Sequence, residues 1–394
     1  MVILFLTGSL EAGQDGVGDY TRRLAFACAR QNNSCRLLAL NDRHVAEPVE
    51  AVEETGGLRV PILRLPAGMD WAGRLERAAA FRASQSVDWI SLQFVAYAFD
   101  GKGIVRNLAR HLGPIVKGSP VHIMFHELWI GTGHAPPFKD RVVGRIQRRY
   151  IRKLAQLLRP AAVTTTNSFY RSLLKELPLP AIELPLFGNI SISTGGPGAG
   201  LREALVRADL CDQTGSHPNH RLGLFFGALY PEWKSEPFLS QLISAAKKVG
   251  KRAGLISAGR LGKSGEEVWK KLRAGYGNTV DFVALGEQPT AEISALMQIA
   301  DFGLATSPWH LLGKSGSVAA MLEHGLPVIV TRDEFRPDTD SVLFADPLLH
   351  RCDSALESKL ETGLPKRPAQ DHVEKTARDF ISILTQANPG AKNV

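Results

Sequence analysis

Cysteine is scarce in this sequence: four occur among 394 residues, and no two follow a CxxC or metal-ligand spacing. Neither a disulfide framework nor a cysteine-ligated metal site is expected, and a reduced, cytoplasmic setting is the simplest interpretation. Long apolar runs are missing as well, since no segment approaches the roughly 20 apolar residues that cross a bilayer. The first eight residues, MVILFLTG, are too short an apolar run for a signal peptide and lack its basic flank. They predict a buried first strand.

Hydrophobic residues make up 44% of the chain and charged residues 22%, a balance typical of folded rather than disordered proteins. At 394 residues the chain is too long for one ordinary core, so we expect two domains. Short apolar runs alternate with amphipathic stretches, which predicts parallel sheets covered by helices on both faces. The expected strands are 2–7, 35–40, 89–94, 121–125, 162–166, 222–226, 253–257, 280–285, 302–306 and 327–331, and the expected helices include 20–31, 138–158, 236–250, 290–299 and 317–324.

A segment rich in glycine, serine and proline separates the expected strands into two sets. Residues 189–200 read NISISTGGPGAG, a composition typical of linkers. We therefore expect a first domain at 1–190 and a second at 200–368. The remainder, 369–394, has helical periodicity up to residue 386 and then a tail. This helix has no strand after it and is a candidate to pack back on the first domain.

Two loops of the first domain are candidates for ligand binding, because open parallel sheets bind ligands beyond the carboxyl ends of their strands. In the first loop, Gly16, Val17 and Gly18 open a helix, whose free N–H groups and dipole would attract an anion. A tight turn that binds nothing explains these residues equally well. In the second, His126 follows a strand directly and has the chemistry to hydrogen-bond a sugar hydroxyl or take a proton. Structural packing is the alternative role for His126.

Two loops of the second domain suit a phosphate. In the loop 226–234, Gly227 allows close approach and Lys234 offers a positive charge, although lysines are common on any surface. The loop 312–317 combines a lysine, small residues and hydroxyls at a helix start, which gives N–H donors, a dipole, a point charge and little bulk. Its residues are Lys314, Ser315, Gly316 and Ser317. Helix capping by a serine is the alternative, but a cap needs neither the lysine nor the extra glycine.

Together these loops resemble those of retaining glycosyltransferase family 4. The runs 300–304, 313–317 and 325–329 are similar to its donor-site segment, and 16–22 is similar to its amino-terminal glycine loop. Residues 92–94 with Tyr97, and 125–127, fit its first domain. Gly227 and Lys234 match its phosphate-binding loop, and Gly286 matches the loop that contacts the nucleotide base. The resemblance implies fold class α/β, GT-B: two Rossmann-like α/β/α domains with an interdomain cleft.

The resemblance also implies the activity, a hexosyltransferase that uses a nucleotide-diphosphate sugar and retains the configuration of the transferred sugar. It implies no cofactor beyond the donor and no obligatory metal. His126 would orient the donor sugar or the acceptor, and Lys234 and Lys314 would stabilise the leaving diphosphate. The acceptor is a glycan, a lipid-linked molecule or a small molecule, and nucleic acid is not expected.

Two departures from the family pattern leave other functions open. The family's pair of glutamates, eight residues apart, falls on Leu312 and Ala320, and the arginine after the glycine of the third loop is Ala228. Ribose and sugar contacts made by those residues therefore do not carry over. A catalytically inactive sugar-nucleotide binder and a nucleotide-sugar epimerase of the same fold are the alternatives.

Two further motifs are given less weight. Asp338 and Asp340 have the DxD form of metal-dependent glycosyltransferases of another fold, but they lie in a polar loop, which we interpret as solvated. The sequences 262–264 and 313–315 resemble the end of a P-loop, yet the leading glycine is Ser257 in one and Pro308 in the other. A nucleotide hydrolase is thus a minor alternative.

Basic residues are concentrated in one expected helix. Residues 138–159 contain eight Lys or Arg and one Asp, a net charge of +7 against +8 for the whole chain. Its apolar side, which we expect to pack on the sheet, comprises Val142, Val143, Ile146, Tyr150, Leu154 and Leu157; the opposite side comprises Arg141, Arg145, Arg148, Arg149 and Arg152. The basic side suits an acidic partner or peripheral contact with the inner face of a membrane. A solvated helix face explains it equally well.

Overall fold

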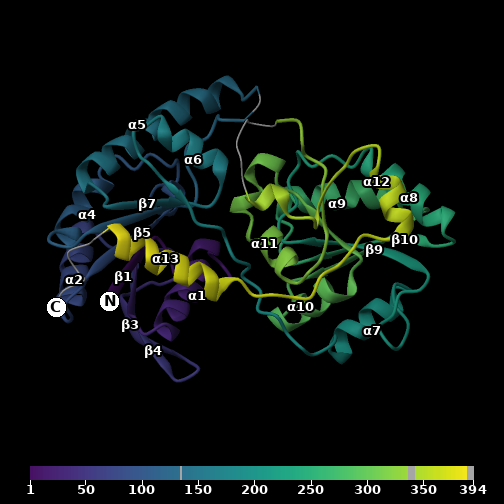
Figure 1. Cartoon of the computed structure of the whole chain (residues 1–394), viewed down its shortest axis with the longest axis horizontal. Coiled ribbons are helices and arrows are strands. Elements are labelled where there is room, and N and C mark those ends of the chain that lie inside the picture. The colour runs from purple at the N-terminus through teal and green to yellow at the C-terminus, as the bar shows by residue number, and fades with distance from the viewer. Residues whose placement is uncertain (134, 336–341, 388–394) are drawn as a thin grey trace. The chain divides into compact units, whose positions relative to one another are not determined.

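The computed structural model describes residues 1–133, 135–335 and 342–387. The chain folds into two compact α/β units (Figure 1). The first consists of Met1–Leu186 together with the segment from Val373, and the second of Phe187–His372. The expected α/β class is confirmed, since each unit contains a sheet of mainly parallel strands with helices packed on it.

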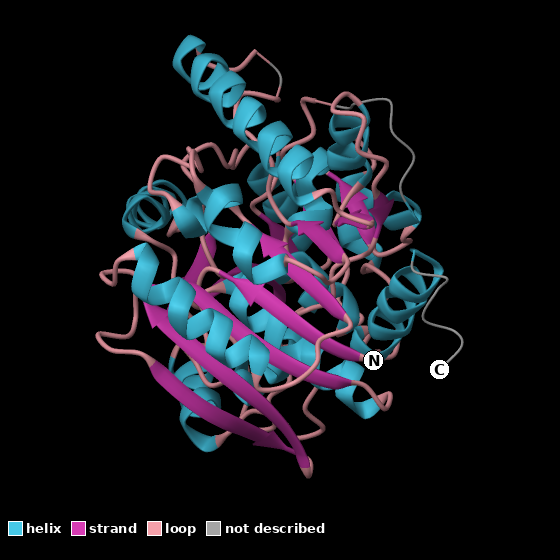
Figure 2. Ribbon diagram, turned by 90° about the vertical axis from the view of Figure 1, so that its left-hand side faces the viewer, coloured by secondary structure: helices cyan, strands magenta, loops and turns pink. Residues whose placement is uncertain are grey.

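The sheet of the first unit has the strand order β3-β4-β2-β1-β5-β6-β7-β8, and its pairs are parallel except β3 with β4. Figure 2 shows its strands side by side, with helices in front of them and behind. The strands are β1 (Val2–Thr7), β2 (Ser34–Asp42), β3 (Val49–Thr55), β4 (Leu58–Pro66), β5 (Trp89–Phe94), β6 (Val121–Phe125), β7 (Ala162–Thr165) and β8 (Ile182–Glu183). The helices are α1 (Gly16–Arg30), α2 (Trp71–Ala83), α3 (Ala96–Phe99), α4 (Leu108–Val116), α5 (Phe138–Leu158), α6 (Ser168–Lys175) and α13 (Val373–Ala387).

The sheet of the second unit is parallel, in the order β11-β10-β9-β12-β13-β14. Its strands are β9 (His220–Phe226), β10 (Arg252–Ala258), β11 (Val280–Gly286), β12 (Phe302–Ala305), β13 (Val328–Val330) and β14 (Leu349–Arg351). Its helices are α7 (Ala199–Arg207), α8 (Phe238–Lys248), α9 (Lys263–Tyr276), α10 (Thr290–Ile299), α11 (Gly316–Glu323) and α12 (Leu356–Thr362), with the 3-10 helices η1 (Trp309–Lys314) and η2 (Val342–Ala345).

All ten expected strands are present, with ends that differ by at most two residues. They were predictable because most of their residues are buried, as in β1 and β5, so both faces are apolar. The hairpin of β3 and β4 was missed. β3 is exposed along nearly its whole length and carries no apolar run. The available signal was the turn Gly56-Gly57, where both residues have positive φ, as a tight hairpin turn requires.

Helix α5 buries a different side from the one expected. Its buried residues are Gly144, Gln147, Ile151, Leu154, Ala155 and Leu158, whereas Val142, Ile146 and Leu157 are exposed. The reason is close packing at Gly144, where a Cβ atom would overlap the carbonyl oxygen of Ile130. Gln147 fixes the same side, because its amide bonds the N–H of Ile130, the hydroxyl of Tyr97 and the carbonyl of Lys102.

Helix α13 packs against the first unit beside α1 (Figure 1). The ring of Phe380 lies 5.7 Å from that of Phe5 and 5.1 Å from that of His122. At the start of the helix, Glu374 pairs with Arg30 and accepts a hydrogen bond from Gln31 at 3.0 Å. Within the described part of the chain, no helix combines the length and apolar character needed to span a bilayer.

Candidate functional site

In each sheet the strand order reverses direction at a central parallel strand, β1 in the first and β9 in the second. β1 pairs with β2 on one side and β5 on the other, and β9 pairs with β10 and β12. Ligands of open α/β sheets bind beyond the carboxyl ends of the strands at such a point. The expected loops follow these strands: 14–20 comes after β1, 226–234 after β9, and 312–317 after β12. His126 follows β6 in the first sheet.

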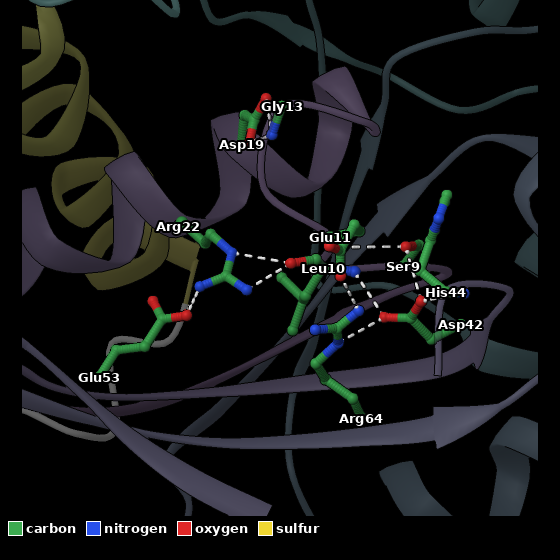
Figure 3. Close-up of polar contacts among 10 residues, drawn as sticks. All are labelled: Ser9, Leu10, Glu11, Gly13, Asp19, Arg22, Asp42, His44, Glu53 and Arg64. Atoms are coloured by element: carbon green, nitrogen blue, oxygen red, sulfur yellow. Dashed lines mark hydrogen bonds and ion pairs between the residues drawn. The ribbon is translucent and has the colours of Figure 1, made fainter. Parts of the chain in front are cut away.

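In the first unit, a buried carboxylate holds the loop that follows β1 (Figure 3). Asp42, at the end of β2, is fully buried and accepts hydrogen bonds from Ser9 Oγ at 3.1 Å, Leu10 N at 3.1 Å and His44 N at 3.0 Å. Arg64 Nε donates to Oδ2 of Asp42 at 2.8 Å, the oxygen that also accepts from Leu10 N. Burial by itself would raise the pKa of Asp42, but Arg64 and the backbone donors outweigh it and lower the pKa. Asp42 is therefore charged at neutral pH.

Two arginines extend this network outward from Asp42 (Figure 3). Arg64 also pairs with Glu11, and Arg22 of α1 pairs with Glu53 and donates to the carbonyl oxygen of Leu10. Sequence reasoning missed Asp42 and Arg64. The available signal was a charged residue at the end of a long buried run, a position that needs a partner.

The start of α1 differs from the expectation of free N–H groups. The N–H groups of Val17 and Gly18 donate to the Asp15 carboxylate at 2.9 and 2.8 Å, and Gly13 N donates to Asp19 at 3.0 Å. A Cβ atom on Gly18 would lie 2.8 Å from the carbonyl oxygen of Ser9, so packing alone requires glycine there. An anion at Val17 and Gly18 would have to displace Asp15. Gly16 is exposed and has open space at its Cβ position.

His126 lies at one end of a chain of buried polar side chains. Its Nε2 atom is 2.8 Å from Gln93 Oε1, and the Gln93 amide donates to Ser91 Oγ at 2.8 Å. Ser91 Oγ is 2.9 Å from His122 Nδ1, and His122 Nε2 is 2.8 Å from Thr164 Oγ1. All five residues are at most 5% exposed. This series of hydrogen-bonded side chains extends across the neighbouring strands β5, β6 and β7.

This series of hydrogen-bonded side chains determines which ring nitrogen of His126 carries the proton. The Gln93 oxygen accepts, so Nε2 of His126 carries the proton and Nδ1 is an acceptor. Burial lowers the pKa of His126 to about 3, and its ring stands edge-on to that of Tyr20 at 4.9 Å. The side chain is only 5% exposed. His126 is therefore neutral at physiological pH and suited to accept a hydrogen bond rather than to carry charge.

In the second unit, glycines border the carboxyl ends of three neighbouring strands. Gly227, Gly259 and Gly286 follow or end β9, β10 and β11 and have φ values of 88°, 87° and 67°. Gly227 N donates to Ala258 O at 2.9 Å, and Gly259 N donates to Gly286 O at 2.7 Å. Apart from the chain neighbours of each glycine, no atom of the described residues lies within 4 Å of a Cβ position on Gly227 or Gly286. This edge of the sheet is accessible backbone that a ligand can approach closely.

A hydrogen bond joins the loop 226–234 to the segment that leads from β12 toward the loop 312–317. Thr306 Oγ1, just after β12, donates to Ala228 O in the loop after β9 at 3.0 Å. Lys234 pairs with Glu334 at 3.3 Å, and their side chains are 61% and 42% exposed. Such an exposed pair contributes at most about 1 kcal/mol. A phosphate could therefore replace Glu334 as the partner of Lys234 at little cost.

The loop before α11 partly fulfils the capping alternative. Ser315 is the N-cap of α11, and its Oγ accepts from Val318 N at 3.4 Å and lies 3.1 Å from Ser317 Oγ. Gly316 and Ser317 form the first turn, and Lys314 ends η1 and is half-buried. Capping does not compete with phosphate binding here, because other N–H groups of the first turn face the same end of the helix.

A buried histidine in this region was missed by sequence reasoning. His310, in η1, is 6% exposed, and its ring packs edge-on against Phe335 at 4.8 Å. Burial, with Arg332 and Lys314 nearby, lowers its pKa to about 4. Leu312 and Ala320, where the family has glutamates, are 1% and 0% exposed in the core of this unit. No carboxylate therefore stands at those two positions.

The second unit also has a cavity next to Gly286. It has a volume of about 360 Å³ and lies between α7, the end of β11 and the start of α10. Its lining comprises Gly200, Leu201, Ala204, Leu285, Gln288, Pro289 and Glu292. This volume is in the range of small-molecule sites.

Metal-binding side chains are not grouped in the described part of the chain, where no three of His, Cys, Asp and Glu lie close enough to hold an ion. The DxD pair, Asp338 and Asp340, and also His134 lie outside the described residues.

Comparison with known proteins gives a match at the level of structure. No protein-family model matches the sequence, and no curated protein does. Solved structures match over essentially the whole chain, and they are GT-B glycosyltransferases. The GT-B fold predicted from the sequence is thereby confirmed.

Three of these structures illustrate the similarity. A glycosyltransferase from Rickettsia africae has 12% sequence identity and a TM-score of 0.57, with 100% of this chain and 99% of that chain covered. The catalytic domain of starch synthase IV from Arabidopsis thaliana, bound to ADP and acarbose, has 11% identity and a TM-score of 0.56 over 98% and 99%. HepE from Anabaena in complex with UDP-glucose has 14% identity and a TM-score of 0.53, with both chains covered completely. At these identities the similarity establishes the fold alone.

Proposed function

We propose that this chain is a hexosyltransferase that moves a sugar from a nucleoside-diphosphate sugar to an acceptor hydroxyl and retains the configuration of the sugar. One observation carries the proposal: the carboxyl edge of the second sheet presents accessible glycine backbone beside two loops that each carry a lysine. This arrangement suits a diphosphate. Similar structures with UDP-glucose and ADP bound support the same ligand class.

The donor would lie across the carboxyl ends of β9, β11 and β12. Its diphosphate would contact Gly227, the first turn of α11 and the ammonium groups of Lys234 and Lys314. Its base would lie beside Gly286, where the cavity between α7 and α10 offers an adjoining space. Lys234 would exchange Glu334 for a phosphate oxygen when the donor binds.

Transfer then needs charge stabilisation on the leaving group. The bond from the anomeric carbon to the diphosphate oxygen breaks as the acceptor oxygen bonds the same face of that carbon. The acceptor proton passes to the diphosphate, whose negative charge Lys234, Lys314 and the α11 dipole stabilise. His126, neutral and with Nδ1 as an acceptor, would orient a sugar or acceptor hydroxyl.

The acceptor is a glycan, a lipid-linked molecule or a small molecule. We place the reaction in the cytoplasm, and the four free cysteines fit a reduced setting. The proposed transfer reaction needs no cofactor in addition to the donor.

The buried Leu312 and Ala320 favour a second candidate, a sugar-nucleotide binder without transfer activity, because the family's carboxylates are absent from those positions. Incubation with labelled nucleotide sugars and a panel of acceptors separates the two. A labelled glycoside, with equimolar release of the nucleoside diphosphate, supports the transferase. Tight donor binding without turnover supports the binder, and interconversion of the free nucleotide sugars indicates an epimerase.

A further inference from the structure

Helix α5 has an exposed surface of mixed apolar and basic side chains, which we call the outer face of α5. Its apolar members are Phe138, Val142, Ile146 and Leu157, which are 74%, 38%, 39% and 52% exposed. Its basic members, all exposed, are Lys139, Arg141, Arg145, Arg149, Arg152 and Lys153. Figure 2 shows α5 as the uppermost helix, which stands clear of the sheet at its first turns.

Packing within the unit does not account for these apolar residues. The side of α5 that faces the sheet is already filled by Gly144, Ile151 and Leu158 and by the buried amide of Gln147. In the described part of the chain, nine large hydrophobic residues are exposed, and four of them lie on this one helix. The concentration points to a partner that covers them.

The positive charge of the outer face is not neutralised. Arg148, which lies beside this face, pairs with Glu176 at 2.8 Å. Across the residues that the structure describes, none of the six basic members is in ion-pair distance of a carboxylate. The partner should therefore be negatively charged as well as apolar.

The two kinds of side chain are interleaved rather than separated. At about 3.6 residues per turn, Phe138, Arg145 and Arg149 fall on one line along the helix, with Val142 and Ile146 beside it. Arg and Lys can lay their apolar stems alongside such residues while their charged ends reach headgroup phosphates. A helix of this kind lies in the interface of an anionic bilayer.

We propose that the outer face of α5 docks the first unit on a bilayer that contains anionic phospholipids. The apolar members select this partner, because nucleic acid and other polyanions would pair with the arginines but leave Phe138 in water. Docking goes beyond the proposed transfer reaction. It is measured without donor or acceptor, so its outcome is independent of whether sugar is transferred.

The first experiment measures binding to vesicles of phosphatidylcholine, with and without phosphatidylglycerol, by flotation at low and high salt. We expect binding only to the anionic vesicles and a decrease with salt. The triple variant Arg145→Gln, Arg149→Gln and Arg152→Gln should bind roughly 100-fold more weakly, since each basic residue near such a surface contributes about fivefold. The matched control, Lys270→Gln, Lys271→Gln and Arg273→Gln on α9, removes the same charge from exposed positions and should bind as wild type does.

The second experiment tests insertion. Phe138→Ser should weaken vesicle binding roughly tenfold through the loss of buried apolar area, and Phe138→Trp should show a blue-shifted emission with anionic vesicles only. Because these side chains are exposed, the variants should keep the circular dichroism spectrum and melting temperature of the wild type.

Four results would overturn the proposal: no binding of the wild type to anionic vesicles at low salt, equal losses in the α5 and α9 triple variants, full binding by Phe138→Ser, or self-association through α5 in place of vesicle binding. Full binding by Phe138→Ser would indicate a surface for polyanions. Self-association through α5 would indicate a second copy of this chain as the partner.

Discussion

At the scale of single residues, buried polar side chains position the carboxyl edge of the first sheet. Asp42 bonds Leu10 and Arg64, and Gln93 bonds His126, all from segments distant in sequence, and both side chains are almost completely buried. Such groups are costly to disturb, because a partner left without its hydrogen bond remains desolvated.

Asp42→Asn should destabilise the first unit by about 3 kcal/mol, because it removes the fully buried charge that Arg64 Nε contacts and leaves Glu11 as the one charged partner of Arg64 among the described residues. The measurement is urea denaturation at neutral pH. Asp379→Asn is the control, since Asp379 forms an exposed i,i+4 pair with Lys375 and its loss should change stability by less than about 0.5 kcal/mol.

The contact between Asp42 and Arg64 should also make the stability of the first unit depend on pH. Because the pKa of Asp42 is lowered in the folded state, its contribution is complete above the unfolded pKa of about 4 and is lost as pH falls below it. Wild type and Asp42→Asn should therefore converge in stability at acid pH. A constant difference between them down to pH of about 2 would contradict the assigned role of Arg64.

His126→Ala should reduce transfer roughly 100-fold through loss of orientation, while the affinity for a nucleoside diphosphate changes little. Because burial lowers the pKa of His126 to about 3, its neutral form persists over the usual assay range, and the pH dependence of the rate should not include this residue. His44→Ala, at an exposed position, is the control. Unchanged transfer in His126→Ala would assign His126 to packing alone.

At the scale of helices and strands, apolar runs predicted the central strands well because those strands are buried on both faces. β3 could not be found in this way, since its residues are exposed at the edge of the sheet. The buried side of α5 was also unpredictable from its wheel, because a glycine and a glutamine, rather than its valines, contact the neighbouring segments.

That explanation for α5 predicts opposite outcomes for two substitutions on it. Gly144→Ala should cost about 3 kcal/mol, because the added methyl group overlaps the carbonyl of Ile130 and the helix must move. Ile146→Ala, on the exposed side, should change stability by less than about 0.5 kcal/mol. Thermal or urea denaturation of both variants checks this, and a larger loss in Ile146→Ala would contradict the observed orientation of α5.

At the scale of the whole molecule, the glycine and lysine loops of the candidate site were predictable because glycine and lysine in strand-to-helix loops are local signals. The supporting residues were not. Burial and, after it, the nearby Arg332 lower the pKa of His310, and Thr306 joins a loop that lies 78 residues away along the chain. Contacts of this separation exist only once the sheet has formed.

Transfer should survive a metal chelator, because Lys234, Lys314 and the backbone N–H groups supply the positive charge that a cation would otherwise provide. Initial rates with and without EDTA, at fixed donor concentration, make the comparison. Loss of activity with EDTA and recovery with magnesium or manganese would instead assign a role to Asp338 and Asp340, which lie outside the described residues.

Binding of a nucleoside diphosphate to the second unit tests the central claim most directly. Calorimetric titration with UDP, ADP, GDP and CDP should give saturable binding of at least one, and a thermal shift should accompany it, since ligand at about 100 times its Kd adds about 2.7 kcal/mol of stability. Lys314→Ala should abolish the binding and Lys234→Ala should weaken it, whereas Lys247→Ala, an exposed lysine on α8, should bind as wild type does. Absence of binding for every diphosphate, or unchanged affinity in Lys314→Ala, would contradict the assignment of the donor site.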